Sequence, residues 1–361
     1  MRFLPGQTEL VCAHCGHVQT ISAADSEHRQ AALREHDLAQ GLRDDLPGEA
    51  MEVVRTTRCT GCGALIELEG ARHATECPFC ATPVVTDTGA TRQIKPQALV
   101  PFAYSEKQAR EALTKWLGSL WFAPSKLLEY TRKNRAMTGV YVPFWTFDAE
   151  TRSAYSGQRG DAYYVTRTVT VNGKQQTRQE RKIRWTSVRG RVARGFDDVL
   201  ILASLSLPQR LGRALTKWDL SRLEPYSADY LAGFTAEGYT VGLADGNAQA
   251  RQEMAAVIAQ DVRRDIGGDE QRIASIDTDY SDETFKHILL PVWMAAYRYG
   301  GKSYRFLVNA QTGEVRGERP WSVWKITFAA IGVAILVAGG LYIANEGGAF
   351  DDVDGLDYWI D

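Results

Sequence analysis

The stretches Cys59-Thr-Gly-Cys62-Gly63 and Cys77-Pro-Phe-Cys80, with fourteen residues between Cys62 and Cys77, decide the fold of this part of the chain. Each C-x-x-C pair turns tightly enough to direct two thiolates at one ion, and Gly63 permits the backbone shape after the second sulfur. Four thiolates fill the tetrahedral coordination that zinc prefers, which leaves no position for water or substrate. The pattern predicts a structural zinc site in a complete zinc ribbon at residues 53–90, with four ligands: Cys59, Cys62, Cys77 and Cys80.

The pairing of the cysteines and the N-terminal sequence favour metal binding over disulfide bonds. All six cysteines lie before residue 81, and each belongs to a C-x-x-C pair. Residues 1–12 contain no apolar run of the length of a signal peptide, so we expect the thiols to stay reduced. An iron–sulfur cluster and redox-active dithiols are the alternative interpretations of the same residues.

Cys12-Ala-His-Cys15 is a third pair with no obvious partner. Residues 3–11 look like the hairpin that precedes the second knuckle of a ribbon. We therefore interpret residues 1–23 as a partial zinc-ribbon knuckle whose first half would lie upstream of Met1 or has been lost. Cys12 and Cys15 are a second candidate metal site, completed by a nearby histidine or by sharing an ion with another chain.

An apolar segment near the C-terminus predicts a membrane-spanning helix. From Ile326 to Ala344 the chain carries no charge, and as a helix this stretch is roughly 28 Å long, close to the ~30 Å hydrocarbon core of a bilayer. Trp321, Trp324 and Tyr342 flank it, where aromatic rings favour the interface. We expect a single transmembrane helix at residues 321–345; the alternative is a buried helix of a globular domain.

The charges around this segment predict its orientation. Arg316, Arg319 and Lys325 precede it, whereas residues 346–361 are acidic and contain no Lys or Arg. Because basic flanks stay in the cytoplasm, we expect a single-pass protein of the bacterial inner membrane with a cytoplasmic N-terminus. Residues 346–361 would form an acidic tail outside the cytoplasm, and the lipid bilayer would be a partner.

The remaining chain predicts a helical linker at residues 24–52 and a duplicated domain at residues 91–320. Gln108 opens a helical stretch that leads into Pro143-Phe-Trp145, and Gln249 opens another that leads into Pro291-Val-Trp293. Asn172-Gly173 between strand-like segments is a strong hairpin signal, and further turns are expected near 300–301 and 311–313. The predicted fold class is α+β, with an N-terminal zinc ribbon, a duplicated unit of a helix plus antiparallel strands, and a single C-terminal transmembrane helix.

No pattern of catalytic residues stands out, so we do not expect an enzyme. Gly301-Lys-Ser303 resembles the end of a phosphate-binding loop, but Ala296 stands where that loop needs glycine. The net charge of −2 gives no overall basic field. A basic stretch runs from Arg178 to Arg194, which we interpret as a solvated strand, a surface for anionic lipid or, third, a nucleic-acid contact.

Several motifs together resemble a known family. They are Cys59–Cys80, Trp121-Phe-Ala-Pro124, Gly139–Ala149, Tyr230–Phe234, Leu290–Trp293, Asn309–Gly313 and the terminal apolar segment. The chain resembles bacterial membrane-anchored zinc-ribbon proteins of the transcription-factor-IIB type, which are often mislabelled as similar to the primosomal replication factor Y helicase. Members of this family usually carry two full ribbons, so the half ribbon at Cys12 is a departure. The incomplete phosphate-binding loop gives the helicase label no support.

The resemblance implies a non-enzymatic adaptor that docks cytoplasmic partners at the inner membrane. The partners that it implies are stomatin/flotillin-like (SPFH) proteins or phage-shock-protein-A-type proteins of a membrane stress system. The alternative function is a membrane-tethered zinc-ribbon protein that binds nucleic acid or takes part in replication.

Overall fold

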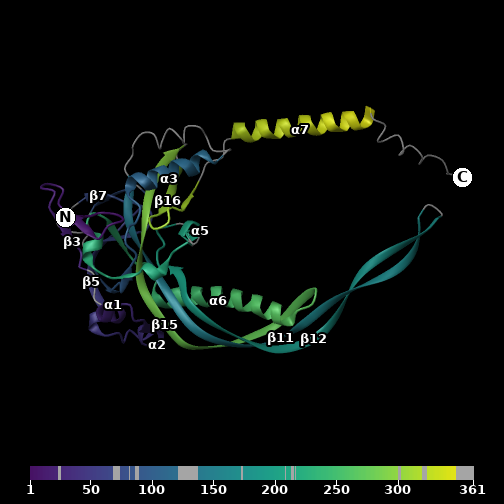
Figure 1. The fold of residues 1–361 in the computed structure, drawn as a ribbon, viewed down its shortest axis with the longest axis horizontal. Helices are drawn as coiled ribbons and strands as arrows, with labels where there is room; N and C mark the ends of the chain where they lie inside the picture. Colours follow the sequence, from purple (N-terminus) through teal and green to yellow (C-terminus); the bar gives the residue numbers. More distant parts are fainter. Residues whose placement is uncertain are drawn as a thin grey trace.

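Strands dominate this chain, and most of them belong to one large mixed sheet (Figure 1). The computed structural model describes residues 1–22, 26–67, 74–80, 82–85, 89–120, 137–171, 174–207, 209–212, 215, 217–299, 302–318 and 323–346.

Three long antiparallel strands form the centre of the sheet: β11 (Thr138–Val171), β12 (Lys174–Leu202) and β15 (Glu270–Tyr299). β11 lies between the other two; Phe144, for example, pairs with Leu202 of β12 and Ile288 of β15. Val171 pairs with Lys174, which confirms the hairpin predicted at Asn172-Gly173.

Side chains alternate between the two faces of the central strands. Both faces are buried in the main body, so the sequences of these strands there are almost continuously apolar. One face carries Val140, Val142 and Phe144 and packs against the module of Cys59–Cys80; we call it the cysteine face. The opposite face carries Tyr141, Trp145 and Phe147 and is covered by helices and the N-terminal strands; we call it the helix face.

Shorter strands extend the sheet on both sides of the central three. Parallel pairs occur between β10 and β15 and between β11 and β14, which makes the sheet mixed. These strands are β4 (His36–Asp37), β5 (Met51–Arg58), β6 (Leu65–Glu67), β9 (Gly89–Ile94), β10 (Ala98–Leu99), β13 (Glu224–Pro225), β14 (Thr235–Gly238), β16 (Lys302–Asn309) and β17 (Val315–Gly317). Two small sheets stand apart, one of β1 (Arg2–Phe3), β2 (Glu9–Val11) and β3 (Val18–Thr20), the other of β7 (Ala74–Glu76) and β8 (Pro83–Val85).

Two amphipathic helices cover the helix face. α3 (Glu106–Gly118) begins at a capping box, in which Gln108 N–H donates to the Ser105 hydroxyl and Ser105 N–H to the Gln108 side chain. α6 (Leu243–Ile266) buries residues at steps of three and four, which lie on one helical face. The remaining helices are α1 (Ser26–Ala32), α2 (Leu38–Leu42), α5 (Gln209–Gly212), α7 (Val323–Glu346) and the short 3-10 helices η1 (Gly48–Ala50), η2 (Leu220–Arg222) and η3 (Ala228–Leu231).

Two β-bulges meet at Asp148. The register of β11 shifts against β12 between Phe147 and Ala149, and against β15 between Asp148 and Glu150. The extra residues include Asp198 and Asp282, which have φ values of 53° and 52°, a conformation that Asp tolerates better than most residues. Bulges bend a strand and raise its twist, and beyond them an extension leaves the main body. It has three strands as far as Gly160, where the pairing of β11 with β15 ends, and β11 and β12 continue farther out as a pair (Figure 1). We call this extension the β-arm: residues 149–171, 174–196 and 270–281.

The predicted α+β fold class with a duplicated unit is wrong. The strands that contain Pro143 and Pro291 do not belong to two successive helix-and-strand units; they pair with each other, Tyr141 opposite Pro291. The cause is that β11 and β15 are buried on both faces, so each needs the other as a neighbour in one sheet. The cysteine module is also not N-terminal, because β1–β4, α1 and α2 precede it.

The predicted transmembrane helix is also corrected. Within the described part of the chain, we find no helix that combines the length and the apolarity needed to cross a membrane. This finding overturns the predicted span at residues 321–345 and the inner-membrane localisation drawn from it; residues 347–361 of the predicted tail lie outside the described residues.

Candidate metal centre

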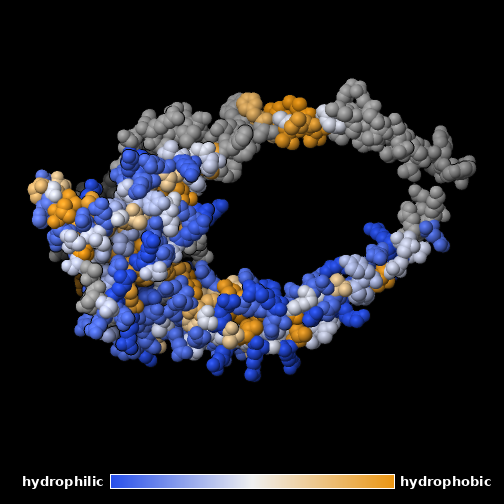
Figure 2. Space-filling view, viewed as in Figure 1, coloured by the Kyte–Doolittle hydropathy of each residue, from blue (hydrophilic) through white to orange (hydrophobic). Residues whose placement is uncertain are grey.

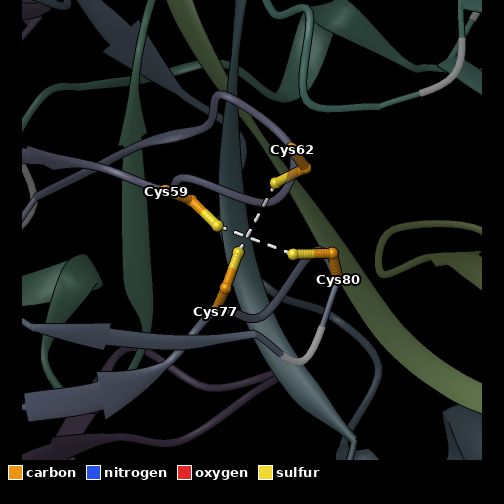
Figure 3. A group of neighbouring side chains, drawn as sticks. All are labelled: Cys59, Cys62, Cys77 and Cys80. Atoms are coloured by element: carbon orange, nitrogen blue, oxygen red, sulfur yellow. Dashed lines mark hydrogen bonds between the residues drawn. The ribbon is translucent and has the colours of Figure 1, made fainter.

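Four cysteine sulfurs converge at the tips of two turns (Figure 3). The Sγ atoms of Cys59, Cys62, Cys77 and Cys80 all lie within 4.8 Å of one another. Cys59 Sγ is 3.6 Å from Cys80 Sγ, and Cys62 Sγ is 3.6 Å from Cys77 Sγ. A tetrahedron with zinc–sulfur bonds of about 2.3 Å has edges of roughly 3.8 Å, so these sulfurs are already spaced as the ligands of one such ion.

The backbone of each turn places its two sulfurs. In the first, Cys59 N–H donates to Ala64 O at 2.8 Å and Gly63 N–H donates to Cys59 O at 2.8 Å. Gly63 has φ +77°, a left-handed conformation that costs glycine little. In the second, Cys77 N–H donates to Thr82 O at 2.9 Å, and Thr82 Oγ1 lies 3.1 Å from Cys80 Sγ. Hydrogen bonds within each turn therefore hold its two cysteines in place.

The cluster is attached to the central sheet. Cys59 and Cys77 are buried and pack in the same core as Val140 and Val142 of the cysteine face. Strand β6, which follows the first turn, pairs with β14, and β14 pairs with β11. The module is consequently continuous with the main sheet through hydrogen-bonded strands.

The thiols of the cluster share protons. A hydrogen bond from Cys77 lowers the pKa of Cys62 to about 5, and the same hydrogen bond raises the pKa of Cys77. The cluster therefore holds a thiolate at neutral pH, which is the form of sulfur that binds metals. The predicted ligands are brought together, and their spacing and donor type are compatible with a zinc site.

The pair at Cys12 and Cys15 has the same turn without the same surroundings. Cys12 N–H donates to His17 O at 2.9 Å, Gly16 N–H donates to Cys12 O at 3.0 Å, and Gly16 has φ +71°, which repeats the geometry around Cys59. In the residues that the structure describes, however, neither cysteine belongs to a group of three or more potential ligands. This second candidate site stays a prediction.

Gly61 is the position where the two turns touch, and we expect it to control the metal affinity. A Cβ at this position would lie 2.5 Å from Thr82 Oγ1 and 3.3 Å from Cys80 Sγ. Gly61→Ala should therefore displace Thr82 and Cys80 and lower the affinity for zinc about tenfold, the lower range for disturbed outer contacts of a metal site. Competition with a chromophoric chelator measures this affinity. Gly48→Ala is the matched control, because no atom lies within 4 Å of its Cβ; equal affinities of the two variants would contradict the prediction.

A second group of polar side chains lies on the cysteine face, beside the bulges, and no sequence motif marks it. Glu35, Asp148 and Asp198 place carboxylate oxygens within 4.8 Å of one another. Lys286 Nζ lies 2.8 Å from Glu35 Oε1 and 2.9 Å from Asp198 Oδ1, and Asp198 N–H donates to Asp148 Oδ1 at 2.6 Å. The lysine ammonium thus serves as the cation of this cluster. The residues come from four distant segments, so no local pattern could reveal them.

The acids of this cluster titrate differently. Burial alone would raise the pKa of Glu35, but hydrogen bonds with Asp148, Lys286 and Thr284 lower it to about 2. Burial and the hydrogen bond with Glu35 raise the pKa of Asp148 to about 7. Burial alone would lower the pKa of Lys286, and its contacts with Glu35 and Asp198 raise it instead. Glu35 and Asp148 consequently hold one proton between them over the acid range.

Comparisons with known proteins give one similarity and no family. No protein-family model matches the chain, and no solved structure matches it. The chain is similar to "Uncharacterized protein YdjG" of Bacillus subtilis (strain 168), with 25% identity over 260 residues that cover 70% of each chain.

Proposed function

We propose that this chain is a non-enzymatic adaptor whose Cys59–Cys80 module binds one structural zinc ion. The observation that carries the proposal is the closed set of four sulfurs: each Sγ atom lies within 4.8 Å of the other three. A cation bound by all four would have no free coordination position for substrate. Zinc in such a site stabilises a fold and does not activate water.

The position of the module supports a scaffolding role. The turns pack on the cysteine face with Cys59 and Cys77 buried, so the metal would fix one side of the central sheet. In this proposal the β-arm, which leaves the main body, is the surface offered to other proteins. SPFH-type or phage-shock-protein-A-type proteins, which the family resemblance implies, are the partners of this proposal; docking at a membrane is no part of it.

Metal analysis of the purified full-length chain tests the zinc site. We expect about one equivalent of zinc in colourless protein, and the same content in Cys15→Ser, whose side chain is exposed. Brown protein that contains iron would contradict the assignment, and so would zinc-free protein that is fully folded.

Affinity purification from cells tests the adaptor role. The full-length chain should enrich SPFH-type or phage-shock-protein-A-type proteins over an untagged control, and metal-depleted chain should enrich them less. A purified chain that captures neither class would contradict the proposed partners.

Nucleic acid is the second candidate partner, favoured by the basic residues of β12. Arg178, Arg181, Arg184, Arg189 and Arg191 are exposed along this strand. Binding of duplex or single-stranded DNA whose affinity falls steeply with salt would favour this alternative, because phosphate contacts release counterions.

A further inference from the structure

The two long edges of the β-arm are open. In the described part of the chain, β12 pairs only with β11. On the other side, the arm segment of β15 (residues 270–281) pairs only with β11, because the partners β4, β10 and β16 contact β15 from residue 284 onward. Each edge therefore presents backbone N–H and C=O groups to which another strand can add.

The two edges carry opposite charge on the cysteine face. Arg189 and Arg191 lie on β12, and Asp277 and Asp279 lie on β15; all four side chains are exposed. Among the described residues, none of the four takes part in an ion pair. Figure 2 shows the β-arm as largely hydrophilic along its length.

The register places Arg191 and Asp277 in the same row across the β-arm. Ala154 of β11 pairs with Arg191 on one side and with Asp277 on the other. Arg152 likewise lies between Ala193 and Asp279, and Ser156 lies between Arg189 and Ser275. The row through Ala154 thus has a cation at one edge, a small side chain in the middle and an anion at the other edge, and the rows beside it add Arg189 at the β12 edge and Asp279 at the β15 edge.

We propose that the β-arm is a self-association surface, in which the β15 edge of one copy adds to the β12 edge of the next. Both strands run antiparallel to β11, so a translated copy would pair them in parallel. Asp277 would then lie beside Arg191 of the neighbouring copy and diagonal to Arg189, within the reach of cross-strand pairs. The contact joins two different surfaces, so it propagates into a ring or a filament.

Charge selects this pairing over the other edge contacts. If two copies met through their β12 edges about a two-fold axis, Arg189 and Arg191 of one copy would face arginines of the other. If they met through their β15 edges, Asp277 and Asp279 would face aspartates. Like charges opposite each other destabilise a strand pair. Charged side chains often protect edges from any association, but that protection fails when the two edges of one molecule are complementary.

Charge reversal tests the proposal in the full-length chain. Sedimentation velocity over a concentration series should show wild-type oligomers that dissociate at high salt. Arg189→Glu/Arg191→Glu and Asp277→Lys/Asp279→Lys should each raise the dissociation constant by about tenfold, because exposed pairs change from attraction to repulsion. A mixture of the two variants, and the fourfold variant with both edges reversed, should associate as the wild type does. Lys107→Glu/Lys115→Glu in α3 is the control for the arginine variant, because it changes the net charge by the same amount.

Several results would overturn the proposal. A wild-type chain that is monomeric at every concentration would do so, and so would oligomers that neither single-edge variant weakens. Failure of the mixture and of the fourfold variant to associate, with circular dichroism showing folded protein, would exclude the edge-to-edge contact. If the arginine variant instead loses salt-dependent DNA binding while the chain stays monomeric, the β12 edge is a nucleic-acid surface.

Discussion

Cys77→Ser should abolish zinc binding and unfold the module that contains residues 59–80. Cys77 is buried, its Sγ lies 3.6 Å from Cys62 Sγ, and it packs in the core of the cysteine face. Loss of one of four thiolates removes most of the affinity, and in small metal modules binding and folding are coupled, with apparent zinc binding energies of about 10–16 kcal/mol. We expect a loss of several kcal/mol in the free energy of unfolding.

Metal analysis, chemical denaturation and limited proteolysis measure this result. The variant should contain almost no zinc and should be cleaved within the module, while Cys15→Ser, which carries the same chemical change at an exposed turn, should behave as the wild type. A Cys77→Ser protein with its full zinc content would show that other residues hold the ion.

Lys286→Met should destabilise the protein by about 3 kcal/mol, the lower range for breaking a buried ion pair. The Lys286 side chain is only 9% exposed and contacts Glu35 and Asp198. Methionine conserves most of its volume, so the cost comes from carboxylates left without a cation. Because these acids are about a quarter exposed, water reduces the loss. Chemical denaturation measures it, with Lys107→Met on the exposed side of α3 as the control.

The loss in Lys286→Met should depend on pH in a defined direction. In the wild type the pKa of Asp148 is raised to about 7, so its contribution to stability is present below the unfolded-state pKa and is lost as the pH rises through 7. Without Lys286 the acids hold protons still more strongly. The deficit should therefore grow between about pH 5 and pH 8, and Asp148→Asn in the same background should recover part of it. A deficit that does not change with pH would contradict the electrostatic explanation.

The cluster of Cys59, Cys62, Cys77 and Cys80 could be predicted from sequence because its determinants are local. Two C-x-x-C turns fix the geometry of each cysteine pair within a few residues, and Gly63 marks the first of them. The hairpins are local as well: Tyr299 pairs with Lys302 and Val308 with Val315, as the turn signals indicated. Chemistry and turn type depend on neighbours in the sequence, so they were predictable.

The sheet could not be predicted in the same way because its order depends on distant pairing. Both Pro–x–Trp motifs suggested strands, but only packing decides that Trp145 lies opposite His287. The bulges at Asp148 need two register shifts on different neighbours, and the Glu35–Lys286 contact joins residues 251 positions apart. The membrane prediction, which rested on the uncharged run of residues 326–344 and its aromatic and basic flanks, was wrong, since no described helix meets the requirement for a span.

The pairing of β11 with β15 has a consequence for folding during synthesis. Val140 of β11 pairs with Val292, so the neighbour of β11 is made roughly 150 residues later. At translation rates of about 5–20 residues per second, β15 follows β11 by roughly 10–30 s. During this interval β11 already has β12 as a hairpin partner, while its other backbone edge stays open beside the apolar side chains of Tyr141 and Phe144. The nascent chain is therefore most exposed to pairing with a neighbouring nascent chain before residue 292 has left the ribosome.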